Sequence, residues 1–156
     1  MLSGNLRELV GYCGLYCGAC GIYQGKIRQA VENLRKIIKA YGFDKYVSEL
    51  AKWDPAFQHY DKFERVLDGF SKMFGECPDC LRGGGDPNCK IRECCKQRGY
   101  RTCAECNEME KCEYLKRYSQ ALASLREIRV MGMDKWAEKM HEKVDQGYSY
   151  LDERLK

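Results

Sequence analysis

The sequence predicts a mainly α-helical fold, in which amphipathic helices pack around a cysteine-knuckle metal-binding segment. Apolar residues recur at helical spacing in several long stretches, with charged residues on the other faces. Eight of the eleven cysteines lie within residues 77–112. Few stretches alternate between apolar and polar residues as strands do. We therefore expect helices with at most short β-hairpins.

At 156 residues the chain is long enough to bury a hydrophobic core, and we expect a single domain, 1–156. Residues 1–25 predict a loop rich in cysteine and glycine, because glycine favours turns over helices. We expect helices over residues 26–75, a cysteine-rich metal-binding subdomain over residues 76–112, and C-terminal helices over residues 113–156.

The helical part before the cysteine-rich segment divides into three elements. A first helix is expected over residues 26–41, where apolar residues line one face, and a short helix near residues 44–52. Asp54 followed by Pro55 predicts the N-cap and first residue of a third helix, which would end at Gly75. These apolar faces indicate ordinary packing rather than a cofactor site.

Helical spacing returns after the cysteine-rich segment. It continues through residues 115–128, and Gly132 interrupts it. Asp134 is then placed to act as the N-cap of a last helix.

The composition favours a cytoplasmic protein without a membrane partner. The N-terminus lacks the basic start and apolar run of a signal peptide, and no run of roughly 18 apolar residues is present. Thiols stay reduced in the cytoplasm, and the cysteine count is odd, so closely spaced cysteines indicate metal ligation rather than disulfides.

The formal net charge of +4 is no evidence for nucleic-acid binding. A zinc ion held by four thiolates carries a charge of about −2, because the ligating thiols lose their protons. Two such ions would cancel the formal charge. We therefore expect a protein partner rather than nucleic acid.

Two similar cysteine repeats give the strongest functional signal. The first repeat is Cys77, Cys80 and Cys89, and the second repeat is Cys103, Cys106 and Cys112. Each begins with CxxC, a turn that places two sulfurs within reach of one tetrahedral zinc ion.

Three pairings of these cysteines stay open. The two CxxC pairs share one zinc ion, or the six cysteines of both repeats hold two bridged zinc ions. In the third pairing, the first repeat and Cys94 hold one ion, and the second repeat takes its fourth ligand from the N-terminal loop. Cys94 and Cys95 are adjacent, so we expect at most one of them on a given ion.

The N-terminal loop carries a third motif, CxxxCxxC, formed by Cys13, Cys17 and Cys20. Radical S-adenosylmethionine enzymes hold a four-iron cluster with this spacing. They also require alternating strands and helices after the motif, which this sequence lacks. An ordinary iron–sulfur cluster, completed by a later cysteine, is the alternative to zinc.

The sequence resembles a family of short prokaryotic proteins, domain of unknown function 3795. The matching motifs are the YCGL of residues 12–15 with Cys17 and Cys20, the two repeats, the C-x-IR-x-C of residues 89–94, and Lys135-Trp136 near the end. A long helical insert between Cys20 and Cys77 departs from the family pattern. The family is taken to bind zinc and brings no established reaction.

The resemblance implies that ten cysteines belong to one pattern and that Cys95 is an extra thiol. The ten candidate metal ligands are Cys13, Cys17, Cys20, Cys77, Cys80, Cys89, Cys94, Cys103, Cys106 and Cys112.

We expect two zinc ions in structural thiolate sites, each stabilising the fold by on the order of 10 kcal/mol. No Ser/His/Asp set is evident, so the sequence favours a binding or adaptor module over an enzyme. The alternatives are an iron–sulfur or thiol-based redox protein, and a thiol-dependent enzyme that uses Cys95.

Overall fold

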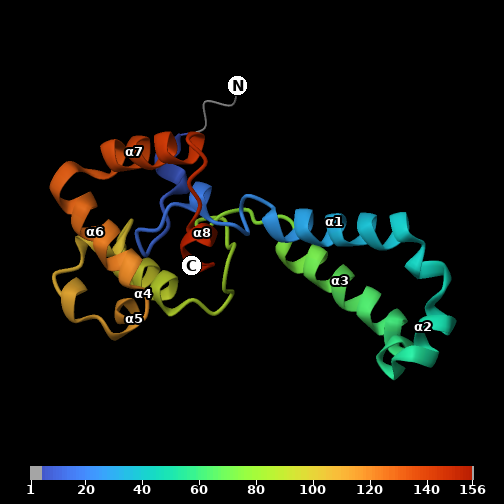
Figure 1. Cartoon of the computed structure of the whole chain (residues 1–156). Coiled ribbons are helices and arrows are strands. Elements are labelled where there is room, and N and C mark those ends of the chain that lie inside the picture. The colour runs from blue at the N-terminus through green and yellow to red at the C-terminus, as the bar shows by residue number, and fades with distance from the viewer. Residues whose placement is uncertain (1–4, 156) are drawn as a thin grey trace. The chain divides into compact units, whose positions relative to one another are not determined.

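The computed structural model in Figure 1 describes residues 5–155, apart from the side chain of Ser119. Residues 1–4 and 156, which begin and end two of the predicted segments, lie outside this range.

The chain divides into two compact units. The cysteine unit comprises residues 1–24 and 78–156, and the hairpin unit comprises residues 25–77. The boundaries of the hairpin unit lie within two residues of the helical segment 26–75 that the sequence predicts. The expectation of a single domain stays a prediction.

The described residues form eight α-helices, joined by turns and short 3₁₀ helices. The α-helices are α1 (Lys26–Tyr41), α2 (Val47–Trp53), α3 (Tyr60–Phe74), α4 (Lys90–Arg98), α5 (Glu113–Lys116), α6 (Ser119–Met131), α7 (Met133–Asp145) and α8 (Tyr150–Arg154). The 3₁₀ helices are Leu6–Leu9, Cys17–Ala19, Phe43–Lys45, Pro55–His59, Cys103–Glu105 and Met109–Lys111. Within residues 5–155 there is no strand, and a lone antiparallel bridge joins Val10 and Tyr16. The mainly helical fold class is confirmed.

The hairpin unit consists of α1 and α3 side by side, with α2 in the connection that joins the end of α1 to the start of α3 (Figure 1). α1 has the predicted bounds, and Gly42 ends it in a left-handed conformation, with φ +72°. Asp54 caps the next element as predicted, because its carboxylate accepts a hydrogen bond from the N–H of Ala56. The prediction of one continuous helix from Pro55 was wrong: residues 55–59 form a 3₁₀ helix, and α3 begins at Tyr60.

One hydrophobic core holds the cysteine unit together. It joins the N-terminal loop to α4, α6, α7 and α8, and includes Val10, Tyr16, Leu125 and Trp136. The ring of Tyr16 meets the ring of Trp136 edge to face, with centroids 6.3 Å apart. This packing fixes the N-terminal loop, which has little regular structure of its own.

The capping role predicted for Asp134 was wrong. α7 follows α6 after a single residue, Gly132, which is the N-cap of α7 and has φ +86°. The carboxylate of Asp134 pairs with the guanidinium of Arg7 instead, at 3.6 Å.

The cysteine-rich segment contains more helix than its motifs predict. α4 begins after Cys89 and ends at Gly99, which has φ +70°. It therefore places Cys94 and Cys95 on a helix rather than on a knuckle. Ile91 and Cys95 are buried and lie four residues apart, on the face that packs into the core.

Candidate metal centres

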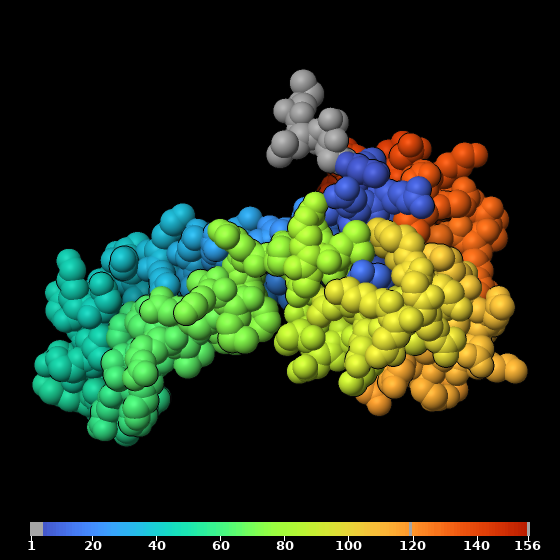
Figure 2. Space-filling model, turned by 180° about the vertical axis from the view of Figure 1, so that it is seen from behind, coloured from blue at the N-terminus to red at the C-terminus, as the bar shows by residue number. Residues whose placement is uncertain are grey.

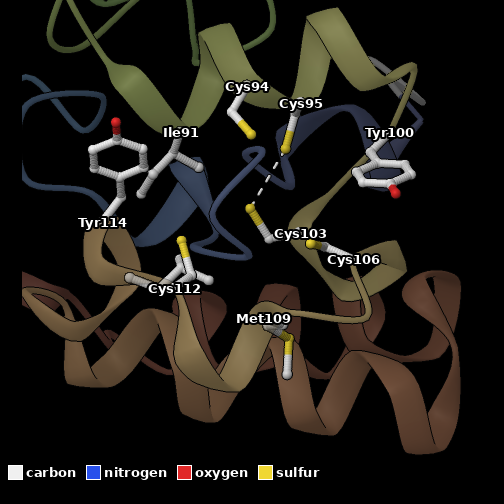
Figure 3. Close-up of a pocket in the computed structure, with 10 residues that line it drawn as sticks. Ile91, Cys94, Cys95, Tyr100, Cys103, Cys106, Met109, Cys112 and Tyr114 are labelled. Carbon is white, nitrogen blue, oxygen red and sulfur yellow. Dashed lines mark hydrogen bonds between the residues drawn. The ribbon is translucent and has the colours of Figure 1, made fainter.

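Five cysteines line a small cavity in the cysteine unit (Figure 3). They are Cys94, Cys95, Cys103, Cys106 and Cys112. The cavity has a volume of about 30 Å³, which is room for one water molecule or one ion. Its remaining lining is apolar or aromatic and includes Ile91, Met109 and Leu115. We call these five cysteines the cavity group.

The cavity group contains one close thiol pair. The sulfur atoms of Cys95 and Cys103 lie 3.4 Å apart and point toward each other (Figure 3). A tetrahedral zinc ion with bonds of about 2.3 Å spaces its sulfur ligands roughly 3.8 Å apart. This pair is therefore close to the separation that a shared ion requires.

The hydrogen bond between these two sulfurs changes the pKa of both thiols. A thiol proton of Cys103 that is donated to the Cys95 thiolate stabilises that anion. The hydrogen bond therefore lowers the pKa of Cys95 and raises the pKa of Cys103. Burial raises the pKa of Cys103 further.

A second set, the N-terminal group, joins the CxxxCxxC motif to the first repeat. The backbone N–H of Cys80 donates a hydrogen bond to the sulfur of Cys17 at 3.4 Å, across 63 residues of sequence. Burial, with smaller contributions from the charges of Cys80 and Cys89, raises the pKa of Cys13 to about 12. The group is Cys13, Cys17, Cys20, Cys80 and Cys89.

Burial keeps three thiols of the N-terminal group, those of Cys13, Cys17 and Cys80, protonated at neutral pH when no metal is bound. It raises the pKa of Cys17 to about 12, with smaller contributions from the charges of Cys80 and Asp79, and it also raises the pKa of Cys80. Metal binding at these sulfurs would therefore release protons.

The N-terminal loop reaches both groups through its backbone. The N–H of Cys103 donates a 2.8 Å hydrogen bond to the carbonyl of Tyr12, between Gly11 and Cys13. Gly11 lies beside Cys80, since a Cβ at that position would be in ordinary contact with the Cys80 sulfur, at 3.5 Å. The loop is thus the shared support of the two groups.

Arg92 supports the first repeat in a way that the sequence analysis missed. Its guanidinium is buried and donates hydrogen bonds to the carbonyls of Gly84, at 2.7 Å, and Asp86, at 2.5 Å. These bonds fix the loop between Cys80 and Cys89. Arg92 precedes Cys95 by three residues, so the two side chains share the buried face of α4. This spacing was the signal by which the burial of Arg92 could have been predicted.

Asp79 is a second residue that sequence reasoning missed. It lies inside the first CxxC, is fully buried and has φ +90°, a conformation that residues other than glycine seldom adopt. Its carboxylate accepts the backbone N–H of Arg82 at 2.9 Å and pairs with the guanidinium of that residue. The turn that presents Cys80 therefore depends on the buried carboxylate of Asp79 and its ion pair with the exposed Arg82.

The grouping differs from the three pairings considered from sequence. Cys94 lies with the second repeat, whereas the third pairing placed it with the first. Cys77 belongs to the hairpin unit. Among residues 5–155, no three His, Cys, Asp or Glu side chains already stand as the ligands of one ion. Metal binding would therefore require side-chain rotations that draw the sulfurs inward.

No helix in the described part of the chain is long and apolar enough to cross a membrane.

The comparisons with known proteins identify a family. A family model described as "Protein of unknown function (DUF3795)" matches residues 9–117, a range that includes all eleven cysteines and more than half of the chain. No curated protein and no solved structure matches the chain. The N-terminal motif, both repeats and Arg92 fall inside the matched range. The chain therefore belongs to the DUF3795 family of proteins of unknown function.

Proposed function

We propose that this protein binds zinc through cysteine thiolates and that the bound ions stabilise the fold of a binding or adaptor module. The cavity of about 30 Å³ lined by five cysteines carries the proposal, because it combines the volume of one ion with soft sulfur donors. Apolar neighbours such as Ile91 and Leu115 bury Cys95 and Cys103 and leave the other three cysteines partly exposed.

We propose one ion for each cysteine group. In the cavity group, Cys103, Cys106 and Cys112 would hold it together with Cys94 or Cys95. In the N-terminal group, four sulfurs are suitable ligands: Cys13, Cys17, Cys80 and Cys89. When bound, zinc would neutralise the thiolates and cross-link segments that are separate in the sequence.

The chemistry of the donor set supports this assignment. Every cysteine lies in the described part of the chain, and none forms a disulfide. Reduced thiols in this number suit a cytoplasmic protein. Two ions with four thiolates each would cancel the formal net charge of +4, so a protein partner is favoured over nucleic acid.

One observation favours a second function, thiol-based redox chemistry. The sulfurs of Cys95 and Cys103, 3.4 Å apart, need little movement to form a disulfide. An iron–sulfur cluster on the same cysteines belongs to this alternative, because such clusters also use thiolate ligands.

The proposal is tested by elemental analysis and visible absorption spectroscopy of protein purified without air or added metal. We expect two zinc ions per chain and no visible band. The Cys112→Ser and Cys13→Ser variants should each lose one ion and keep the other. Iron with acid-labile sulfide and a broad visible band would replace zinc with the redox alternative. Protein that lacks metal and gains none from equimolar zinc would refute metal binding altogether.

A further inference from the structure

The cavity group has one cysteine more than a tetrahedral ion can bind. Five cysteine sulfurs line the cavity, and a tetrahedral zinc ion takes four of them. Cys94 and Cys95 are adjacent on α4, so their side chains leave the helix about 100° apart and compete for the fourth position. Whichever of the two binds the ion, the other stays beside it as a free thiol.

The cavity group also contains two sulfurs that are close to bonding distance. The sulfurs of Cys95 and Cys103 are 3.4 Å apart and point toward each other (Figure 3), so they need to approach by about 1.4 Å to reach the length of a disulfide bond. In the N-terminal group, the contact between Cys17 and Cys80 joins a sulfur to a backbone N–H instead. The geometry therefore favours oxidation in the cavity group.

The backbone holds both members of this pair in place. Cys95 lies on α4, and its carbonyl accepts a 2.9 Å hydrogen bond from the N–H of Tyr100, just after the helix ends. Cys103 begins a 3₁₀ turn that a capping box fixes, formed by the side chains of Thr102 and Glu105. The two sulfurs can therefore meet without a large movement of either segment.

A small oxidant can reach the pair through the wall of the cavity. Cys95 and Cys103 are buried, but Cys94, Cys106 and Cys112 are partly exposed and line the same cavity. The segment that carries these cysteines forms part of the outer surface of the cysteine unit, coloured yellow-green to yellow in Figure 2. A molecule little larger than water, such as hydrogen peroxide, therefore meets the sulfurs without unfolding of the core.

We propose that hydrogen peroxide converts Cys95 and Cys103 into a disulfide and thereby releases the ion of the cavity group, so that this site binds zinc only under reducing conditions. The inference rests on the proposed function, because it requires the zinc ion. Cys103 is a ligand in both arrangements of that ion. The disulfide therefore removes one ligand when Cys94 holds the fourth position and two ligands when Cys95 holds it. The ion of the N-terminal group stays bound.

The reaction uses one hydrogen peroxide molecule for each disulfide. One sulfur of the pair attacks a peroxide oxygen, the O–O bond breaks, and hydroxide leaves as a sulfenic acid forms. The other sulfur attacks the sulfenic sulfur, so the S–S bond forms, the S–O bond breaks and a second hydroxide leaves. The two sulfurs together lose two electrons, and both hydroxides become water with protons from the free thiol and the solvent. Zinc has no redox chemistry and keeps its charge of +2.

The test uses the full chain purified without air, and its zinc content is measured before any oxidant is added. Excess hydrogen peroxide is then added together with the zinc-binding dye pyridylazoresorcinol, with the dye alone as the control. We expect one of the two ions to reach the dye while peptide mass mapping finds a Cys95–Cys103 cross-link. Dithiothreitol and added zinc should restore the bound ion. Retention of both ions, or release of an ion without this cross-link, would overturn the inference.

Two matched variants locate the reactive pair. Cys94→Ser and Cys95→Ser each leave four cysteines around the cavity, so both should bind two zinc ions. Cys95→Ser lacks the contact with Cys103 and should release its cavity ion at least tenfold more slowly than the unmodified chain. Cys94→Ser keeps the contact and should release the ion within threefold of the unmodified rate. Equal rates for the two variants would overturn the assignment to this pair.

A Cys95→Ser variant that binds only one ion before oxidation would make Cys95 a ligand itself. The cross-link in Cys94→Ser then decides the question. A disulfide between Cys95 and Cys103 supports the inference, and a disulfide between any other cysteines overturns it.

Two further variants show which ion leaves. Cys112→Ser, which should lack the cavity ion, should release no zinc to the dye, whereas Cys13→Ser should release the one ion that it keeps. Release from Cys112→Ser at the unmodified rate would assign the oxidation to the N-terminal group and overturn the inference. The zinc content before oxidation separates the two proposals. Protein without zinc contradicts the proposed function, and protein with two ions that peroxide does not release contradicts this inference alone.

Discussion

Cys95 and Cys103 hold their sulfur atoms 3.4 Å apart within the hydrophobic core of the cysteine unit, although they come from different motifs. Cys95 lies on α4 and is 1% exposed, and Cys103 begins a 3₁₀ turn. Cys95, which the resemblance implies to be an extra thiol, is thus in contact with the first cysteine of the second repeat.

This contact predicts the first disulfide to form in metal-free protein. Diamide should take one proton and one electron from each thiol and should itself become the hydrazine, leaving a Cys95–Cys103 bond. Peptide mass mapping should find this cross-link before any other, with a loss of two hydrogen atoms. Zinc-loaded protein should react more slowly, because ligation occupies the sulfur lone pairs. An earlier cross-link between any other cysteines would contradict the prediction.

Removal of metal should unfold the cysteine-rich segment first. The cavity group and the N-terminal group lie on turns and short 3₁₀ helices that have little regular structure, so these segments depend on the ions that we propose. Chelation should increase proteolytic cleavage within residues 77–112, with cleavage in α1 as the internal reference. Circular dichroism and protease resistance that stay unchanged after complete metal removal would show that the fold does not depend on metal.

Arg92 should be the most sensitive charged position on α4. Arg92→Ala leaves the buried carbonyl of Gly84 and the partly buried carbonyl of Asp86 without their charged donor, at a cost of about 3 kcal/mol in the free energy of unfolding. Lys96→Ala, an exposed change on the same helix, should stay within about 0.5 kcal/mol. Urea denaturation of both variants measures the difference, and similar values for the two would remove the supporting role from Arg92.

Gly14 should tolerate substitution less than Gly99. Both have positive φ, +80° and +70°, so alanine costs about 1–2 kcal/mol of backbone strain at either position. A Cβ at Gly14 would also lie 2.7 Å from side-chain atoms of Leu125, whereas nothing lies within 4 Å at Gly99. Thermal denaturation should therefore show the larger loss for Gly14→Ala, by a further 1–3 kcal/mol or so. Equal losses would mean that Leu125 moves aside freely.

The stability of the reduced, metal-free protein should fall as the pH rises above about 9. The folded state raises the pKa of Cys13 and Cys17 from 9.0 to about 12, so between these values the unfolded chain binds fewer protons than the folded chain. The stability from these thiols is then fully present below pH 9 and is lost as the pH approaches 12. Tyr16 and Tyr150, whose pKa values burial raises to about 12, act in the same direction above pH 10.

Urea denaturation in steps from pH 8 to pH 10 measures the effect of the thiols before the tyrosines contribute. The Cys17→Ser variant should show a shallower decline than the unmodified chain. A stability that rises over this interval would mean that these thiols ionise more easily in the folded state than in the unfolded chain.

The sequence alone determined the local features of this protein. Helical spacing is a property of neighbouring residues, so it gave the bounds of α1 and predicted helix on both sides of the cysteine-rich segment. The cysteine motifs and the resemblance likewise depend on order along the chain, and the family match confirms the resemblance. The assignment of ten cysteines as metal ligands stays a prediction.

Only the tertiary structure decided which cysteines meet. The CxxxCxxC motif lies with Cys80 and Cys89, and α4 brings Cys95 to Cys103, because the packing of Tyr16 and Trp136 fixes the N-terminal loop in the core. The burial of Arg92 depends on how the preceding loop folds against α4, since its acceptors are the carbonyls of Gly84 and Asp86, eight and six residues earlier in the chain. Contacts between residues far apart in sequence arise from the packing of the whole unit, and no local spacing encodes them.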